Sequence, residues 1–380
     1  MRVYKLRLKN FLSIRDIDLE LGKLNVFVGP NSSGKSNIVR ALQLLSNHAR
    51  VGVPVLPGYR DFKSVVHGFD PTKQIELEIE AEINGRSVEY ILALTPDSYI
   101  EIASTDGEEV LFSSGGYFQA RVLARGGRDK IVFNKEPYTP TSERSFIRCS
   151  FKSALISLPR EAAEEVRLLA ELLEGFAIHS FDPRYIRLTS RVADEPSLGY
   201  EGGRLARVLL HLYLENRETF AEIEGVLRSL IPEVEQVILH IEGESVELWL
   251  RVKHLREPLK PANISDGTLR MLAYITVLHS GTTLAAFEEP ENFVHPHLLE
   301  TLVNLARKAP CQVIMTTHSP YLLDHVKPEE VYVVEKPGVE TIVKKLSETK
   351  EVEAVKKLLE EGGTLGEAWY SGIMGGVPRS

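Results

Sequence analysis

The stretch GPNSSGKS, residues Gly29 to Ser36, decides how this chain folds. It follows a short apolar run, Leu24 to Val28, and opens a segment with the apolar spacing of a helix. Glycines followed by Lys-Ser between a strand and a helix form the pattern of a phosphate-binding loop, or P-loop. A chance match in a chain of this length is expected on the order of one time in a hundred. The sequence therefore predicts a nucleotide site built on a P-loop.

Each part of the loop has a predicted task. The glycines allow the backbone to curl until its N–H groups point at the phosphates. Gly34 stands at the expected helix N-terminus, where unpaired N–H groups and the helix dipole favour an anion. Lys35 would reach the β- and γ-phosphates of ATP, and Ser36 would give a hydroxyl ligand to Mg²⁺. The predicted nucleotide-binding residues of the loop are Gly29, Pro30, Asn31, Ser32, Ser33, Gly34, Lys35, Ser36 and Asn37.

A second stretch, TTLAAFEEPE from Thr282 to Glu291, ends an apolar run in two adjacent carboxylates. Ligands of open parallel sheets bind beyond the carboxyl ends of the strands, where these carboxylates would lie. Glu288 is predicted to hold Mg²⁺, directly or through water, and Glu289 to orient or deprotonate the attacking water. An isolated Glu-Glu pair would more often be a solvated acidic loop, but the P-loop in the same chain favours the catalytic interpretation.

A third stretch, ISDGTLR from Ile264 to Arg270, has two interpretations. Ser265 can simply cap the helix that is expected from Thr268. Alternatively, the helix N-terminus is an anion site aimed at a second nucleotide. The local sequence does not separate the two interpretations.

His318 lies in a fourth stretch, VIMTTHSP from Val313 to Pro320, directly after an apolar strand and before a Ser-Pro turn. Taken alone, a hydrogen-bonded histidine at a strand end is the better interpretation. Because it follows the other three motifs in order, His318 becomes a candidate sensor of the γ-phosphate.

Length and composition restrict the class of protein. The chain has 380 residues, of which 43% are hydrophobic and 26% charged, as is typical of a globular protein with a sizeable core. No apolar run approaches the roughly 20 residues of a membrane span, and the alternating start is unlike a signal peptide. The only cysteines, Cys149 and Cys311, fit a reducing compartment. These features predict a cytoplasmic protein without a membrane partner.

Hydrophobic spacing outlines the rest of the chain. Alternation with a period of two predicts an antiparallel β layer that continues to about Phe133. Helical spacing follows, including a helix over 159–176, and alternating helices and strands then predict a parallel sheet with crossover helices. The predicted fold class is α/β, with the antiparallel layer, a mostly parallel sheet and a helical insertion. The predicted units are an N-terminal lobe with the P-loop (1–152), the insertion with returning strands (153–262), a C-terminal lobe with the other three motifs (263–346), and a C-terminal helix and tail (347–380).

The order of the four motifs resembles that in ABC-type ATPase heads of the SMC, RecF and OLD group. The stand-alone AAA-family ATPases of the OLD/RecF kind look most similar. The opening LKNFLSIRDIDLELGKLNVFVGPNSSGKSN is similar as well. The resemblance covers residues 1–50 and 262–335 well and the middle in outline. It implies a P-loop NTPase fold and hydrolysis of ATP to ADP and phosphate with Mg²⁺, slow without a stimulus.

The resemblance also implies a homodimer that forms on ATP binding. In such heads, Ser265 and Gly267 of one subunit would contact the γ-phosphate held by the P-loop of the other. Asn292 and His295 would lie near that interface. This arrangement gives Ser265 the second role that its local sequence leaves open.

Three positions depart from the pattern of the group. The first carboxylate is Glu288 where Asp is more usual, and the extra methylene moves it outward by roughly a bond length. Leu12 stands where a basic residue often follows Asn-Phe, and Arg15 or Lys9 could take its place on the phosphates. No Q-loop glutamine can be assigned, because Gln74 begins a predicted strand instead of ending one.

The resemblance favours an ATP-driven dimer that acts on DNA, in repair, chromosome handling or defence. The net charge of −8 is unlike that of a general nucleic-acid coat, so DNA binding would need a local basic patch. The run ARVLARGGRDK offers Arg121, Arg125, Arg128 and Lys130, although a solvated hairpin tip is the favoured interpretation.

Two other functions fit less well. An ABC transporter subunit would have a glutamine-ended signature, whereas this chain has Ser-Asp-Gly-Thr and Glu-Glu-Pro-Glu. An OLD-type nuclease would carry an acidic metal-dependent domain after the ATPase, and the segment after His318 is too short for one. A nuclease or other effector is therefore expected to be a separate partner protein.

Overall fold

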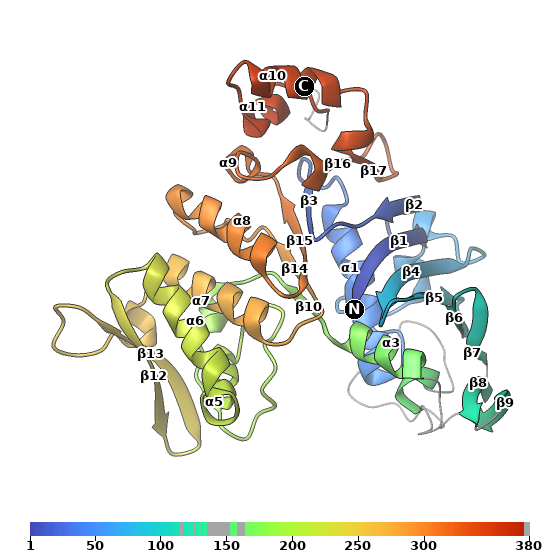
Figure 1. Cartoon of the computed structure of the whole chain (residues 1–380), viewed down its shortest axis with the longest axis horizontal. Helices are drawn as coiled ribbons and strands as arrows, with labels where there is room; N and C mark the ends of the chain where they lie inside the picture. The colour runs from blue at the N-terminus through green and yellow to red at the C-terminus, as the bar shows by residue number, and fades with distance from the viewer. Residues whose placement is uncertain (115–116, 125–126, 135–152, 158–163, 376–380) are drawn as a thin grey trace.

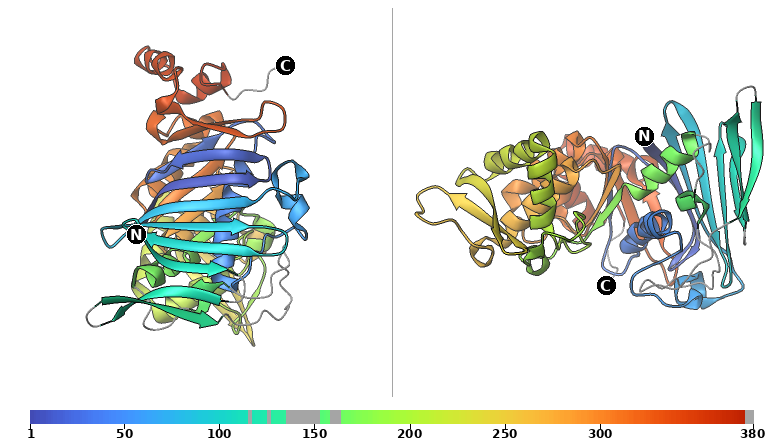
Figure 2. Two further views of the ribbon diagram at one scale, coloured as in Figure 1. Left: turned by 90° about the vertical axis from the view of Figure 1, so that its right-hand side faces the viewer. Right: turned by 90° about the horizontal axis from the view of Figure 1, so that it is seen from below.

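Two sheets enclose the helix that follows the P-loop, α1 (Lys35–Val51) (Figure 1). The computed structural model describes residues 1–114, 117–124, 127–134, 153–157 and 164–375, and for 117–134 only the backbone. Figure 2 shows α1 between the broad antiparallel sheet and the six-stranded sheet that includes β3. A single apolar core joins α1 to both sheets, with Leu8, Ile38 and Ile314 fully buried in it.

The antiparallel sheet has eight strands in the order β2-β1-β4-β5-β6-β7-β8-β9. Alternation places apolar side chains against α1 and charged ones outside, as in sheets with one solvated face. On the outside, Arg7 bridges Asp18 and Glu78 on the two neighbouring strands. The strands are β1 (Arg2–Phe11), β2 (Ile14–Glu20), β4 (Ile75–Ile83), β5 (Arg86–Leu94), β6 (Tyr99–Thr105), β7 (Glu108–Ser114), β8 (Tyr117–Ala124) and β9 (Gly127–Asn134).

The second sheet has six strands in the order β10-β14-β15-β3-β16-β17, and all but β17 are parallel. Its central strands are buried on both faces, which explains why their apolar residues do not alternate with charged ones. Because β3, β14 and β15 are parallel neighbours, their carboxyl ends meet at one edge. The strands are β3 (Leu24–Val28), β10 (Phe176–His179), β14 (Leu284–Glu288), β15 (Gln312–Thr317), β16 (Val331–Glu335) and β17 (Ile342–Lys345).

Most of the remaining elements cover the far side of this sheet and extend from it (Figure 1), whereas α2 and α3 lie with α1 and the antiparallel sheet. A three-stranded sheet in the order β11-β13-β12 packs against α5 and α6. These strands are β11 (Ser190–Arg191), β12 (Val234–Glu242) and β13 (Ser245–Val252). The helices are α2 (Phe62–Val65), α3 (Glu164–Glu174), α4 (Pro183–Ile186), α5 (Leu205–Glu215), α6 (Arg217–Leu230), α7 (Asp266–His279), α8 (Leu299–Lys308), α9 (Pro320–Leu323), α10 (Val352–Glu360) and α11 (Leu365–Tyr370).

The α/β class is confirmed, with its antiparallel layer and mostly parallel sheet. The strands β10 and β11 were not predicted; for β10, the helix expected over 159–176 ends at Glu174 and Phe176 begins the strand. A short apolar run such as this one cannot be told from a buried helix by its spacing. Cys311 is buried and free, while Cys149 lies outside the described residues. No helix in the described ranges is long and apolar enough to cross a membrane.

Candidate active site

The P-loop leaves β3 and enters α1 through two glycines in close contact with the chain behind them. Gly34 has a φ of 101° at the N-cap of α1, a left-handed conformation that favours glycine. A Cβ on Gly34 would collide with the side chain of Thr341, and a Cβ on Gly29 with the backbone carbonyl of Val334. The loop is therefore supported from behind by β16 and by the segment that leads to β17.

Lys35 folds back over the loop. Its Nζ donates to the carbonyl oxygens of Gly29 at 2.6 Å and Pro30 at 2.9 Å, and the residue is only 7% exposed. Burial lowers the pKa of Lys35, while the carboxylates of Glu288 and Glu289 oppose that shift. The ammonium thus lies among carboxylates and backbone carbonyls, where a phosphate group could replace the carbonyls as its partner.

Ser36 and Glu288 meet at the carboxyl end of β14. The Ser36 hydroxyl donates to Glu288 Oε2 at 2.5 Å, and the Tyr200 hydroxyl donates to Glu288 Oε1 at 2.7 Å. Burial and the nearby carboxylate raise the pKa of Tyr200, which keeps its hydroxyl a donor. Mg²⁺ prefers such hard oxygen ligands, typically one or two carboxylates together with phosphate oxygens and water. The donor set of Ser36 and Glu288 fits Mg²⁺ bound with ATP.

Glu289 is held in one orientation by its neighbours. It has a φ of 46°, and its backbone N–H donates to the carbonyl of Thr316 at 2.9 Å. Its Oε1 lies 3.0 Å from His318 Nδ1, and its Oε2 accepts from the Asn292 side chain at 2.9 Å. The predicted base and the predicted sensor are therefore in direct contact, although they lie on different strands.

The third motif begins α7 and presents its N-terminus outward. Ser265 caps the helix, because its hydroxyl accepts from the backbone N–H of Thr268 at 3.2 Å. A Cβ on Gly267 would lie 2.8 Å from the carbonyl of Phe293. Arg187 pairs with Asp266 at 2.5 Å and fixes the same turn. Ser265 is exposed, so the cap leaves its surface accessible to a second molecule.

The pocket over the P-loop has a volume of about 400 Å³ and is open to solvent. It brings together most of the predicted phosphate site with Glu289, whereas Ser265 and Gly267 are absent from its lining. Its lining residues are Ser13, Asn31, Ser32, Ser33, Gly34, Lys35, Ser36, Asn37, Arg40, Glu289, Thr316 and Lys336.

A family model described as "AAA domain, putative AbiEii toxin, Type IV TA system" matches residues 24–324. The chain belongs to this AAA family. It is similar to an OLD nuclease of Thermus scotoductus, with 23% identity over 360 residues that cover 89% of this chain and 63% of that protein. The chain therefore spans less than two thirds of the length of that relative.

Two solved structures share the fold of this AAA-family chain. The SMC head bound to the C-winged helix domain of ScpA matches with a TM-score of 0.59 and 15% identity, over 93% of this chain and 100% of that one. The second structure is an SMC head with an extended coiled coil, bound to the C-terminal domain of ScpA derived from Pyrococcus furiosus. It matches with a TM-score of 0.55 and 12% identity, over 95% of this chain and 99% of that one. Together with the family match, these similarities confirm the resemblance to ABC-type ATPase heads of the SMC, RecF and OLD group.

The basic residues that line the nucleotide pocket of this AAA-family chain are not the two suggested from the sequence, Lys9 and Arg15. Lys9 pairs with Glu76 at 2.9 Å on the outer face of the antiparallel sheet, and Arg15 pairs with Glu340 at 3.4 Å. Neither lines the pocket, whereas Arg40 and Lys336 do. Arg40 and Lys336 lie far in sequence from Leu12, so the Asn-Phe pattern around Leu12 could not indicate them.

The structure also places Asn37 and Gln74, the glutamine that the sequence analysis rejected for the Q-loop. Asn37 lines the pocket, but its side-chain amide donates to Ser13 Oγ at 2.6 Å. Gln74 precedes β4 in the antiparallel sheet, where its carbonyl accepts from Asn10. The edge strand β10 pairs with β14, and the loop after β10 brings Tyr200 to Glu288. Tyr200 carried no motif, so only the structure could identify it.

Glu291, the last residue of the EEPE box, supports the histidine turn. It is 8% exposed, and burial raises the pKa of its carboxyl. Its Oε1 accepts from Thr317 Oγ1 at 2.5 Å, and Thr317 Oγ1 in turn accepts from the backbone N–H of Ser319 at 2.9 Å. These bonds fix the turn that contains His318, which lies between Thr317 and Ser319 in the sequence.

Replacing Thr317 with Val should destabilise the fold and slow turnover without changing ATP affinity. Among the described residues, Glu291 Oε2 has no hydrogen-bond partner, so the substitution would leave the whole buried carboxyl unsatisfied. Such a loss costs about 1–3 kcal/mol. Urea unfolding measures it, with Thr276→Val as the matched control, because Thr276 is equally buried and donates only to a carbonyl of its own helix. Equal destabilisation by both substitutions would contradict the role given to Thr317.

Proposed function

We propose that this chain binds ATP with Mg²⁺ and hydrolyses it to ADP and phosphate. The observation that carries the proposal is the meeting of Ser36 with Glu288 beside the Glu289–His318 pair, at the N-terminus of α1. These groups follow three parallel strands whose carboxyl ends meet at one edge of the sheet, which is where ligands of open parallel sheets bind.

Each side chain would have its own task in this reaction. Lys35 would exchange its bonds to the loop carbonyls for bonds to the β- and γ-phosphates. Glu289, held by Asn292 and His318, would orient a water and accept its proton. His318 would shift toward the γ-phosphate and report its presence. Mg²⁺, held by Ser36 and Glu288, would neutralise charge on the phosphate oxygens during transfer.

The same proposal includes a homodimer that forms on ATP binding. Ser265 and Gly267 would complete the site of the partner molecule, and the exposure of Ser265 at the N-terminus of α7 supports this role. Phe293, beside Gly267, is 67% exposed, and such an apolar side chain would be covered in a dimer. Asn292 and His295 would lie near this interface.

Steady-state hydrolysis by the purified chain tests the proposal. Phosphate release should require Mg²⁺, stop on addition of EDTA, and rise more than linearly with protein concentration if a dimer is the active form. A chain that binds ATP without ever releasing phosphate would contradict the hydrolysis step. A linear dependence over a range where the protein is monomeric would contradict the dimer.

We also propose a cytoplasmic, DNA-related role together with an effector protein. The name of the OLD nuclease relative supports it, and this chain corresponds to 63% of that protein's length. A separate effector such as a nuclease would supply the cutting activity. Co-purification of such a chain, with DNA cleavage only in the reconstituted mixture, is the expected result; cleavage by this chain alone would contradict the division of labour.

Neutralising the β8–β9 hairpin should reduce salt-sensitive DNA binding if the hairpin is a DNA contact. The register places Arg121 opposite Lys130, and Arg128 opposite Leu123. Arg125 lies outside the described residues. Each lost phosphate contact should lower the slope of log affinity against log salt by about 0.9. Fluorescence anisotropy at several salt concentrations measures this, with Lys356 and Lys357 of α10 neutralised as a control. Unchanged binding would rule out the patch.

A further inference from the structure

The loop that follows β10 reaches into the metal site. Its backbone is fixed to the end of β10, because Ser180 N–H donates to the Tyr200 carbonyl at 2.9 Å and His179 Nδ1 lies 3.0 Å from the Gly199 carbonyl. Gly202 follows with a φ of 89°, and a Cβ there would lie 2.7 Å from the Ile186 side chain. Tyr200 is thus presented by a tight, well-anchored turn.

The hydroxyl of Tyr200 acts on the carboxylate that the metal would need. Glu288 has two oxygens, and the structure occupies one with Ser36 at 2.5 Å and the other with Tyr200 at 2.7 Å. Glutamate has one more rotatable bond than the aspartate usual at this position. A hydrogen bond to each oxygen removes that freedom, because the carboxylate can then adopt only one orientation.

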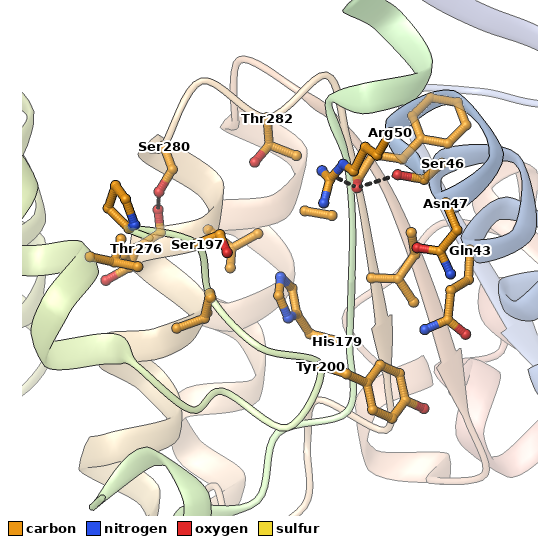
Figure 3. Close-up of a pocket in the computed structure, with 17 residues that line it drawn as sticks. Gln43, Ser46, Asn47, Arg50, His179, Ser197, Tyr200, Thr276, Ser280 and Thr282 are labelled. Carbon is orange, nitrogen blue, oxygen red and sulfur yellow. Dashed lines mark hydrogen bonds between the residues drawn. The ribbon is translucent and has the colours of Figure 1, made fainter. Parts of the chain in front are cut away.

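Tyr200 packs against the apolar core and also lines a cavity. The ring borders a cavity of about 270 Å³ between α1, β10 and α7, and Figure 3 shows Gln43 and Asn47 of α1 on the neighbouring wall. Packing against the core supports the ring, and hydrogen bonds to Glu288 and to the Ser180 side chain direct its hydroxyl. Removing the oxygen alone should therefore leave the fold intact.

Resting on the proposed function, we propose that Tyr200 is a positioning residue that holds the longer Glu288 carboxylate ready for Mg²⁺. It takes no part in bond breaking. It compensates for the glutamate at this position and makes metal affinity depend on the loop between β10 and α5. A residue that supports a metal ligand from outside typically contributes ten- to a hundredfold to metal affinity.

Tyr200→Phe is the test, measured as the Mg²⁺ dependence of binding of a fluorescent ATP analogue. The half-saturating Mg²⁺ concentration should rise by about ten- to a hundredfold, while nucleotide affinity in EDTA and the melting temperature stay at the parental values. Tyr213→Phe removes the same atom from an exposed tyrosine of α5 and should match the parent in every measurement. An unchanged Mg²⁺ requirement, or an equal loss of affinity with and without Mg²⁺, would overturn the positioning role.

A double-mutant comparison separates this inference from the proposed function. In a Glu288→Gln background, Tyr200→Phe should have no further effect on the Mg²⁺ requirement, since the tyrosine acts through the carboxylate. An additive loss would overturn that route. A parent protein whose nucleotide binding ignores Mg²⁺ would instead overturn the proposed function, and the inference with it.

Discussion

The Glu289→Gln protein should bind Mg²⁺ and ATP, fail to hydrolyse it and accumulate as a dimer. Glutamine has nearly the same shape, and its remaining oxygen can still accept a hydrogen bond where Glu289 now contacts Asn292 or His318. The amide has no basic oxygen for the proton of water, so general-base catalysis, worth roughly 10²–10⁴-fold, is lost. Because ATP would hold the two copies together, loss of turnover should trap the dimer.

Two measurements decide this prediction. Light scattering with and without Mg-ATP gives the mass, and single-turnover assays give the rate. Glu300→Gln on α8 is the matched control and should hydrolyse ATP at the parental rate. A parental rate in Glu289→Gln would remove this residue from the base role. An unchanged mass with ATP bound would instead point to a different partner chain or to a permanent dimer, and would leave the roles of Ser265 and Gly267 supported by resemblance alone.

The parts of the site that sequence predicts are those set by local geometry. A P-loop needs its glycines, Lys35 and Ser36 within a few residues, and Glu288 and Glu289 follow directly from the end of an apolar strand. Parallel pairing of β3, β14 and β15 then explains why motifs far apart in sequence converge. A predicted strand order would have been enough to place them at one edge.

Other parts depend on tertiary contacts that leave no local pattern. Tyr200 lies in an irregular loop, and its position follows from the pairing of β10 with β14. Because the run Phe176–His179 is short and apolar, its sequence does not distinguish a strand from a buried helix. The position of the loop that follows it could therefore not be predicted either. Arg187 reaches Asp266 from the same loop, again without a motif. On the proposal for Tyr200, the glutamate at position 288 is the feature of the sequence that relates to this support.

Lys35→Ala should abolish measurable ATP binding. The ammonium makes two hydrogen bonds to loop carbonyls, at 2.6 and 2.9 Å, and these would be exchanged for charge-assisted bonds to phosphate oxygens. Each such bond contributes about 1.5–3 kcal/mol, so losing two lowers affinity by roughly 100-fold or more. Alanine also removes the positive charge that faces Glu288, Glu289 and Glu291, and their unopposed charge would then repel the triphosphate.

Titration calorimetry with ATP and Mg²⁺ tests this effect, and it should exceed that of any other single substitution in the pocket. Lys308→Ala, at the exposed end of α8, removes the same side chain elsewhere and should bind ATP like the parent. The melting temperature of the free Lys35→Ala protein must be measured as well, because the carbonyls of Gly29 and Pro30 lose their donor. A folded variant that keeps parental affinity would show that the glycine loop does not bind phosphate, whatever its sequence. If the variant loses ATP affinity only when Mg²⁺ is present, the Lys35 ammonium interacts with the Mg²⁺–ATP complex and not with the phosphates of free ATP.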